Sequence, residues 1–226
     1  MADQHTKDTW TVFKIMGEFV EGFETLRPVW PAVSIFGSAR VGRHHRYYRL
    51  AVDVARALSD AGFSVITGGG GGIMEAANSG ADQGRGRSIG LNIKLPREQA
   101  ANGFADTVIH FNYFFARKVM FVKYACGFVG LPGGYGTMDE IFEALTLRQT
   151  GKIRDFPVVL LGTEHWQGLL AWMEERLVPE KMITRRDFGM LRVTDDVDEV
   201  VHLIERSYAK RRKIKGPQDG IGRETP

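Results

Sequence analysis

The sequence predicts an α/β fold in which helices cover both faces of a parallel sheet. Three observations lead to this prediction. Short apolar runs alternate with amphipathic segments from residue 31 onward, the short runs are apolar throughout, and glycine turns follow several of them. Strands without a polar face are typical of parallel sheets buried between two helix layers. The expected architecture is a Rossmann-like, doubly wound parallel sheet with an N-terminal helical extension.

The N-terminal extension is predicted to be one amphipathic helix over residues 8–27. Apolar side chains rich in Phe and Met recur at helical spacing along it, and the pair Arg27-Pro28 ends it. Its polar face carries glutamates, which argues against a role at a membrane surface. We assign residues 1–30 to this extension and expect the helix to pack on the main domain or on a partner subunit.

Residues 31–210 are predicted to form one Rossmann-like domain, without an internal repeat or a long linker. Its apolar runs are expected to be strands at 32–36, 63–67, 88–93, 107–111, 128–131, 158–161 and 191–194. Its amphipathic segments are expected to be helices at 47–61, 73–83, 113–124, 138–150, 166–177 and 197–210.

The composition is that of an ordinary globular chain, with 226 residues, 43% hydrophobic and 25% charged. No apolar run approaches the roughly 20 residues that cross a bilayer, and the first residues lack the pattern of a signal peptide. We therefore expect a cytoplasmic protein without a membrane partner. The single cysteine, Cys126, excludes an internal disulfide, and no zinc-type Cys or His spacing is present, so no metal is expected.

Basic charge is concentrated near the C-terminus, although the net charge is only +3. Such a cluster can contact nucleic acid, but here no aromatic residues interleave with it. We expect residues 211–226 to form a basic, disordered tail and expect no nucleic-acid partner. The basic residues are Lys210, Arg211, Arg212, Lys213 and Lys215.

Glycine turns follow three of the predicted strands, at residues 37–38, 68–72 and 133–136. Ligands of open parallel sheets bind beyond the carboxyl ends of the strands, and helix N-termini attract phosphate. The three turns therefore predict a nucleotide or phosphate site. The second strand ends in Thr67 without the acid that holds a dinucleotide ribose, and no Walker motif is present. A mononucleotide is favoured over NAD or a triphosphate, and no cofactor is expected.

Two charged residues are candidates for the chemistry. Glu140 completes a Thr137-x-x-Glu140 pattern, which fits a helix capping box, but its carboxylate is equally placed to act on the sugar of a nucleotide. Arg117 lies in an apolar helix, where arginine needs an anionic partner. It is either a surface residue at the helix edge or a partner of Glu140 or of a substrate phosphate.

The nine residues Pro132 to Glu140 match the PGGxGTxxE signature of the LOG family, which is named after the plant "lonely guy" protein. Arg117-Lys118 matches the upstream Arg-Lys of the same family. Residues 34–40, 68–78 and 145–152 resemble further family motifs, so the resemblance runs from about residue 12 to about residue 205. The chain looks like the longer bacterial branch, although Gly71 stands where that branch often has proline.

The resemblance implies a phosphoribohydrolase that releases the free base from a cytokinin riboside 5′-monophosphate, or from AMP. It implies that Arg117 and Glu140 are the catalytic pair and that the protein is a homodimer or a larger homo-oligomer. It further implies that Gly133, Gly134, Gly136 and Thr137 hold the 5′-phosphate, and that Gly37, Ser38, Gly69, Gly70 and Gly71 line the nucleotide pocket.

Two other functions are compatible with the sequence: a carrier that binds a nucleotide or cofactor without cleaving it, and a nucleosidase with another base preference. Family members were long labelled lysine decarboxylases. Decarboxylation with pyridoxal phosphate needs a Schiff-base lysine, and neither Lys118 nor Lys123 has a recognisable cofactor context.

Overall fold

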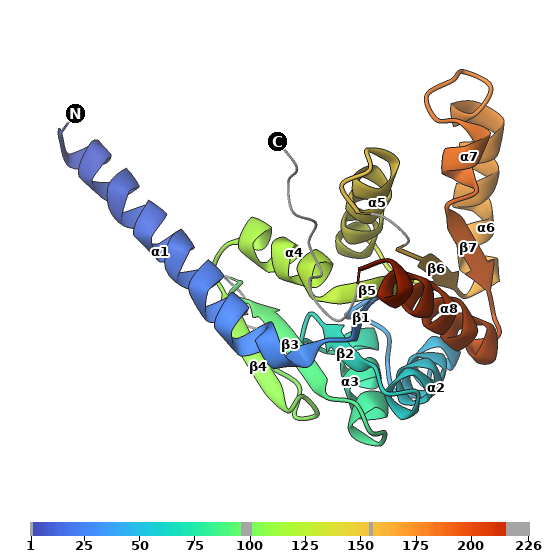
Figure 1. Cartoon of the computed structure of the whole chain (residues 1–226), viewed down its shortest axis with the longest axis horizontal. Helices are drawn as coiled ribbons and strands as arrows, with labels where there is room; N and C mark the ends of the chain where they lie inside the picture. The colour runs from blue at the N-terminus through green and yellow to red at the C-terminus, as the bar shows by residue number, and fades with distance from the viewer. Residues whose placement is uncertain (1, 96–100, 154–155, 216–226) are drawn as a thin grey trace.

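The computed structural model describes residues 2–95, 101–153 and 156–215 (Figure 1). Seven parallel strands form one sheet in the order β4-β3-β2-β1-β5-β6-β7. The strands are β1 (Ala32–Phe36), β2 (Ser64–Thr67), β3 (Ser88–Ile93), β4 (Thr107–Phe111), β5 (Ala125–Gly130), β6 (Val158–Leu161) and β7 (Leu191–Thr194). The helices are α1 (Ala2–Leu26), α2 (Arg46–Asp60), α3 (Ile73–Asp82), α4 (Phe114–Lys123), α5 (Tyr135–Gln149), α6 (Thr163–Trp172), α7 (Arg185–Phe188) and α8 (Val197–Lys215).

The strand order confirms the predicted Rossmann-like fold. The chain builds the sheet outward from β1 through β2 and β3 to β4, and then returns to add β5, β6 and β7 on the other side of β1. β1 and β5 are neighbours, but the chain after β1 continues toward β2 on one side, whereas the chain after β5 continues toward β6 on the other. Such a switch point opens a crevice at the carboxyl ends of the strands, where ligands bind.

Apolar side chains fill both faces of the sheet. One layer packs under α4, α5 and α6, and it contains a group of aromatic rings in edge-to-face contact around Phe128. The other layer packs under α2, α3 and α8 and includes Val33, Ile35 and Val65. β1, β2 and β5 are buried along their whole length, because both of their faces are covered. This explains why their sequences are apolar throughout.

The N-terminal helix α1 is fastened to the domain near its C-terminal end. The carboxylate of Glu18 accepts hydrogen bonds from the backbone N–H and the side chain of Asn112, each at 2.7 Å, and Gly22 packs against Met120 of α4. Earlier in α1 large apolar side chains are exposed, and Figure 1 shows this end projecting away from the rest of the domain. The exposed residues include Trp10, Phe13, Met16 and Val20.

Several predicted bounds differ from the structure, and one helix was not predicted. Helix α5 begins at Tyr135 rather than at residue 138, and β5 spans Ala125–Gly130 rather than 128–131. Helix α7 was not expected, although Thr184 and Asp187 form a capping box at its start. The prediction of a disordered tail from residue 211 is wrong for residues 211–215, because α8 continues to Lys215. Residues 216–226 lie outside the described part of the chain.

None of the helices in the described ranges is long and apolar enough to span a bilayer. Within the same ranges, no group of three or more His, Cys, Asp or Glu side chains is arranged to hold a metal ion.

Candidate active site

A cleft of about 730 Å³ opens at the carboxyl ends of β1, β2 and β3, beside the start of α5. Its walls bring together residues from three glycine turns and from α4, which are far apart in the sequence. Eight of the predicted site residues line it: Gly37, Ser38, Gly70, Arg117, Gly134, Gly136, Thr137 and Glu140. Three others, Gly69, Gly71 and Gly133, do not line it.

Gly133 and Gly69 do not line the cleft, but the conformation of their turns requires glycine at both positions. A side chain at Gly133 would collide with Thr137 Oγ1, at 2.1 Å from the added Cβ. Gly69 has a φ of 70°, a conformation that side chains other than glycine rarely adopt. Close contact and backbone conformation therefore explain these two glycines without a direct contact to a ligand.

The turn after β5 presents the N-terminus of α5 to the cleft. Gly134 is the residue before the helix, and Tyr135, Gly136 and Thr137 form its first turn. The first N–H groups of a helix have no partner within the helix, and the helix dipole makes this end positive. Thr137 adds a hydroxyl and is only 5% exposed. This end of the cleft is therefore suited to a phosphate.

Of the two interpretations of Thr137 and Glu140, the capping box is wrong. Helix α5 starts earlier, so Thr137 is the third helical residue and no side chain caps the helix. Glu140 is buried, with 4% of its surface exposed, and its Oε2 makes no hydrogen bond. Its carboxyl group lines the cleft instead.

Burial raises the pKa of Glu140 to about 7, against the opposing effect of Lys118 and Arg117. A buried carboxyl group loses hydration that its charged form needs more than its neutral form. Glu140 therefore exchanges its proton near neutral pH, which is the range in which catalytic carboxyl groups operate.

Arg117 lines the same cleft from α4, so it is not the surface residue that one interpretation allowed. Its guanidinium lies over the rings of Phe114 and Phe121, at 5.2 and 5.6 Å from their centroids. Its Nε is buried without a hydrogen-bond partner, and burial lowers its pKa. Arg117 and Glu140 influence each other's charge, but they form no ion pair. Each keeps one buried polar atom without a hydrogen-bond partner in the wall of the cleft.

Lys118, which follows Arg117 in the sequence, is paired with two carboxylates and is therefore not free to bind a ligand in the cleft. Its Nζ contacts Asp139 Oδ2 at 2.8 Å and donates to Glu143 Oε2 at 2.7 Å. Both acids flank Glu140 on α5. This bridge fixes α4 against α5 and so sets the relative position of Arg117 and Glu140.

The loop after β1 is joined to the other two turns by backbone contacts. The N–H of Ser38 donates to the carbonyl of Pro132, and its carbonyl accepts from the N–H of Ile73, each at 3.0 Å. Gly72 has a φ of 64°, and a Cβ there would lie 2.4 Å from the Ser38 carbonyl oxygen. The three turns therefore form one connected unit.

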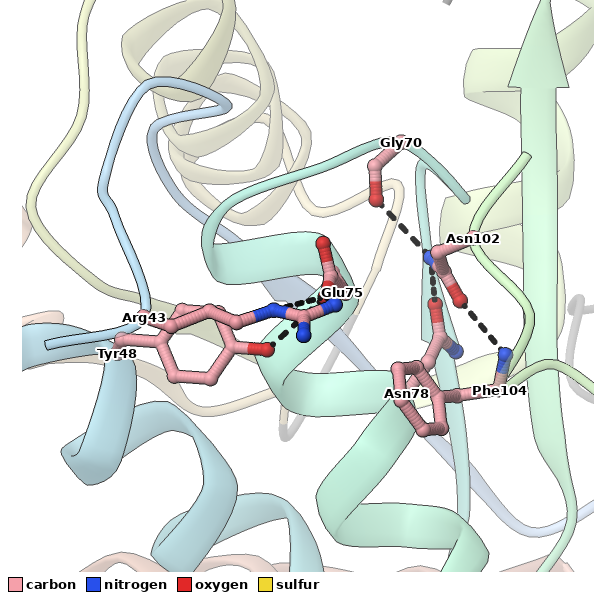
Figure 2. A network of polar contacts seen from close by, with 7 residues as sticks. All are labelled: Arg43, Tyr48, Gly70, Glu75, Asn78, Asn102 and Phe104. Carbon is pink, nitrogen blue, oxygen red and sulfur yellow. Dashed lines mark hydrogen bonds and ion pairs between the residues drawn. The ribbon is translucent and has the colours of Figure 1, made fainter. Parts of the chain in front are cut away.

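Side chains reinforce this unit at two places, both drawn in Figure 2. Glu75, in the first turn of α3, accepts hydrogen bonds from Arg43 and from the hydroxyl of Tyr48. Asn102 donates to the carbonyl of Gly70 at 2.9 Å and to Oδ1 of Asn78 at 3.0 Å. The first group holds the loop after β1 against α3, and the second holds the glycine turn after β2.

The sequence prediction missed several residues of the cleft. Most are apolar or lie on loops, where a single sequence carries little signal. Asn92 is different, because it is a polar residue near the carboxyl end of an otherwise apolar strand, and that position could have identified it. The residues missed are Phe36, Ala39, Arg40, Gly68, Met74, Asn92, Ile93, Leu95, Phe114, Phe121, Tyr135 and Met138.

Comparison with known proteins gives consistent results. A family model described as "Possible lysine decarboxylase" matches residues 74–204. The chain is 31% identical over 185 residues to the cytokinin riboside 5′-monophosphate phosphoribohydrolase of Rhodococcoides fascians, covering 79% of this chain and 91% of that protein. It is 31% identical over 160 residues to the protein of the same name from Mycobacterium marinum, covering 70% and 85%.

Two solved structures share the fold. The molybdenum cofactor binding protein from Rippkaea orientalis has a TM-score of 0.59 at 22% identity and covers 78% of this chain and 96% of that chain. The molybdenum cofactor carrier protein from Chlamydomonas reinhardtii has a TM-score of 0.57 at 23% identity, with 79% and 98% covered. At this identity the likeness concerns the fold alone. The family match and the two relatives at 31% identity establish that this chain belongs to the LOG family.

Proposed function

We propose that this protein hydrolyses the N-glycosidic bond of a nucleoside 5′-monophosphate, AMP or a cytokinin riboside 5′-monophosphate, and releases the free base and ribose 5-phosphate. The observation that carries the proposal is the pair Arg117 and Glu140. The half-buried Arg117 and the buried Glu140, of opposite charge, line one cleft, form no ion pair, and each keep a buried polar atom without a hydrogen-bond partner. The names of the relatives from Rhodococcoides fascians and Mycobacterium marinum support the same reaction.

The 5′-phosphate binds at the start of α5. The free N–H groups of its first turn and the Thr137 hydroxyl supply hydrogen bonds, and the helix dipole supplies a favourable field. Gly134 and Gly136 leave room for the phosphate oxygens to approach the backbone, because nothing lies within 4 Å of a Cβ added at either position.

Glu140 lies one turn further into α5, so its carboxylate is near the sugar of a nucleotide bound in this way. As the bond between C1′ and the base nitrogen breaks, the electron pair leaves with the base and positive charge develops at C1′. The Glu140 carboxylate stabilises this charge, and a water molecule adds its hydroxyl to C1′ to complete ribose 5-phosphate, while the proton released by that water goes to the leaving base. Arg117 orients the phosphate–ribose unit or Glu140 itself.

Decarboxylation does not fit the site. A lysine that forms a Schiff base must be free and must reach the cleft, yet the described residues that line the cleft include no lysine. Lys118 is bound to two carboxylates, and Lys123 lies over the rings of Phe23 and Tyr124.

We also propose that the chain assembles as a homodimer or a larger homo-oligomer. Helix α1 exposes Trp10, Phe13, Met16 and Val20 at between 55% and 63%, and α4 exposes Phe114 at 51%. Monomers rarely expose such a concentration of large apolar side chains. Because Phe114 also lines the cleft, a second copy packed on α4 would shield the mouth of the site from water.

The test is base release from the purified protein with AMP, GMP, CMP and isopentenyl-AMP, followed by chromatography of the products. Cleavage of at least one nucleotide is expected, with loss of nearly all turnover in Glu140→Gln and retention of nucleotide binding. Binding without any base release would favour the alternative function of a nucleotide or cofactor carrier. Normal turnover in Glu140→Gln would exclude the assigned role of that residue.

A further inference from the structure

Asn92 presents to the cleft a carboxamide that no described residue pairs with. It lies near the carboxyl end of β3, is 6% exposed, and lines the cleft. Its side chain makes no hydrogen bond with the residues that the structure describes. Because the carboxamide is open to the cleft, a ligand that fills the cleft must offer it complementary polar groups, or bury it unpaired at a cost in free energy.

The neighbouring Asn78 shows the contrast. Its Oδ1 accepts from the hydroxyl of Thr67 at 2.6 Å and from Asn102 at 3.0 Å. Its Nδ2 donates to Ser88 Oγ at 3.0 Å and to the carbonyl of Ile89 at 3.1 Å. Asn78 is a structural amide with every group paired. Asn92, in the neighbouring strand β3, has the same groups unpaired and lines the cleft.

The sheet places Asn92 at the end of the cleft opposite the turn after β5, residues 133–136, where we propose that the phosphate binds. The strand order β5-β1-β2-β3 puts three strand spacings, about 14 Å, between the two. Between them lie the turns after β1 and β2, and Arg117 Nη1 lies 3.7 Å from the position of a Cβ on Gly68. A nucleotide with its phosphate on α5 and its sugar beside Glu140 and Arg117 therefore extends its base toward Asn92.

The surroundings of Asn92 suit a flat, mostly apolar ring with one polar edge. Ile93, Leu95 and Met74 line this part of the cleft. A carboxamide offers a donor and an acceptor side by side. Adenine presents the complementary pair, because its 6-amino group donates and its ring N7 accepts, whereas a 6-oxo purine presents two acceptors.

We propose that Asn92 selects 6-amino purines as the base, its Oδ1 accepting from the 6-amino group and its Nδ2 donating to the adjacent ring nitrogen. This inference rests on the proposed function, since it assumes that the phosphate binds on α5. A paired donor and acceptor of this kind discriminates between bases by about 10- to 100-fold.

The experiment compares AMP with IMP, which differs at the purine 6 position and keeps the same sugar and phosphate. The wild-type protein is expected to cleave AMP with a kcat/KM about 10- to 100-fold above that for IMP. Asn92→Leu is expected to lower the value for AMP toward the value for IMP. His110→Ala is the matched control, because His110 pairs with Asn92 across β3 and β4 and is exposed, and it should keep the preference.

Dissociation constants of AMP and IMP, measured in the Glu140→Gln background, separate this inference from the proposed function. If no nucleotide is cleaved but AMP binds more tightly than IMP and Asn92→Leu removes the difference, the proposed function fails and the inference stands. Equal affinity and equal cleavage of AMP and IMP by the wild-type chain would overturn the inference without any variant. If Asn92→Leu lowers kcat/KM for AMP and for IMP by the same factor, the inference is also overturned, because that pattern is expected of a structural residue.

Discussion

Replacing Glu140 by glutamine should stabilise the protein in a pH-dependent way. Burial raises the pKa of Glu140 from an ordinary 4.5 to about 7, so the folded state holds the proton more tightly than the unfolded state does. The favourable contribution of the protonated group is complete below about pH 4.5 and is lost as the pH rises through about 7. Glutamine resembles the protonated form and does not ionise.

The size of the effect follows from the two pKa values. The side chain is only 4% exposed, so solvent screening reduces it little. Above pH 7, ionisation of the buried carboxyl group costs roughly 3 kcal/mol of folding free energy, and at pH 5 less than about 1 kcal/mol. For a chain of this length, roughly 3 kcal/mol corresponds to an increase in Tm of about 6–12 °C.

The assay is thermal unfolding of the wild-type protein and Glu140→Gln at pH 5 and pH 8, without nucleotide. The variant should melt well above the wild type at pH 8 and close to it at pH 5. Asp139→Asn is the control, because this neighbouring carboxylate is 58% exposed and its contact with Lys118 contributes little. An increase in the Tm of Glu140→Gln over the wild type that is the same at both pH values, or a decrease at pH 8, would refute the reasoning from burial.

Three further predictions follow from the same structure. Because the proposed mechanism uses the carboxylate form of Glu140, kcat/KM for AMP should rise with pH through an apparent pKa near 7, and a fall over that range would contradict the proposed role. Gly71→Ala should raise stability by about 0.4–1 kcal/mol in urea unfolding, since a Cβ there meets nothing closer than 3.7 Å; Gly72→Ala, at a φ of 64°, should lower it. Phe13→Glu should shift the oligomer toward monomer in light scattering, whereas Lys14→Glu, also exposed, should not; an unchanged mass for Phe13→Glu would count against this interface.

The fold could be predicted from local patterns because the central strands are buried on both faces. The bounds of β1, β3, β4, β6 and β7 agree with the prediction, since an apolar run between turn residues has few other interpretations. The start of α5 could not be predicted in the same way. Tyr135 and Gly136 suggested a turn, and helix propensity near a glycine is weak, so the Thr137-x-x-Glu140 pattern left a capping box and a catalytic carboxyl group equally open, and the structure forms no side-chain cap.

Which residues share the site was only partly predictable. The sequence could identify the glycine turn at residues 133–136, Arg117 and Glu140, because their residue types are unusual in their local context. Asn92 and the bridge from Lys118 to Asp139 and Glu143 could not, because they depend on how α4, α5 and β3 meet in space. Sequence spacing carries no information on contacts between elements that far apart.

The sequence by itself determined the fold class, the glycine turns and the charged pair of residues, because each depends on residue type and short-range spacing. Only the tertiary structure decided what Glu140 does. A capping box and a catalytic carboxyl group have the same local sequence, and they differ in where the helix starts and in what surrounds the carboxyl group. Folding starts α5 at Tyr135, buries Glu140 in the wall of the cleft that Arg117 also lines, and leaves its Oε2 without a hydrogen-bond partner. Burial then raises the pKa of Glu140 to about 7, and this shift depends on the surrounding fold.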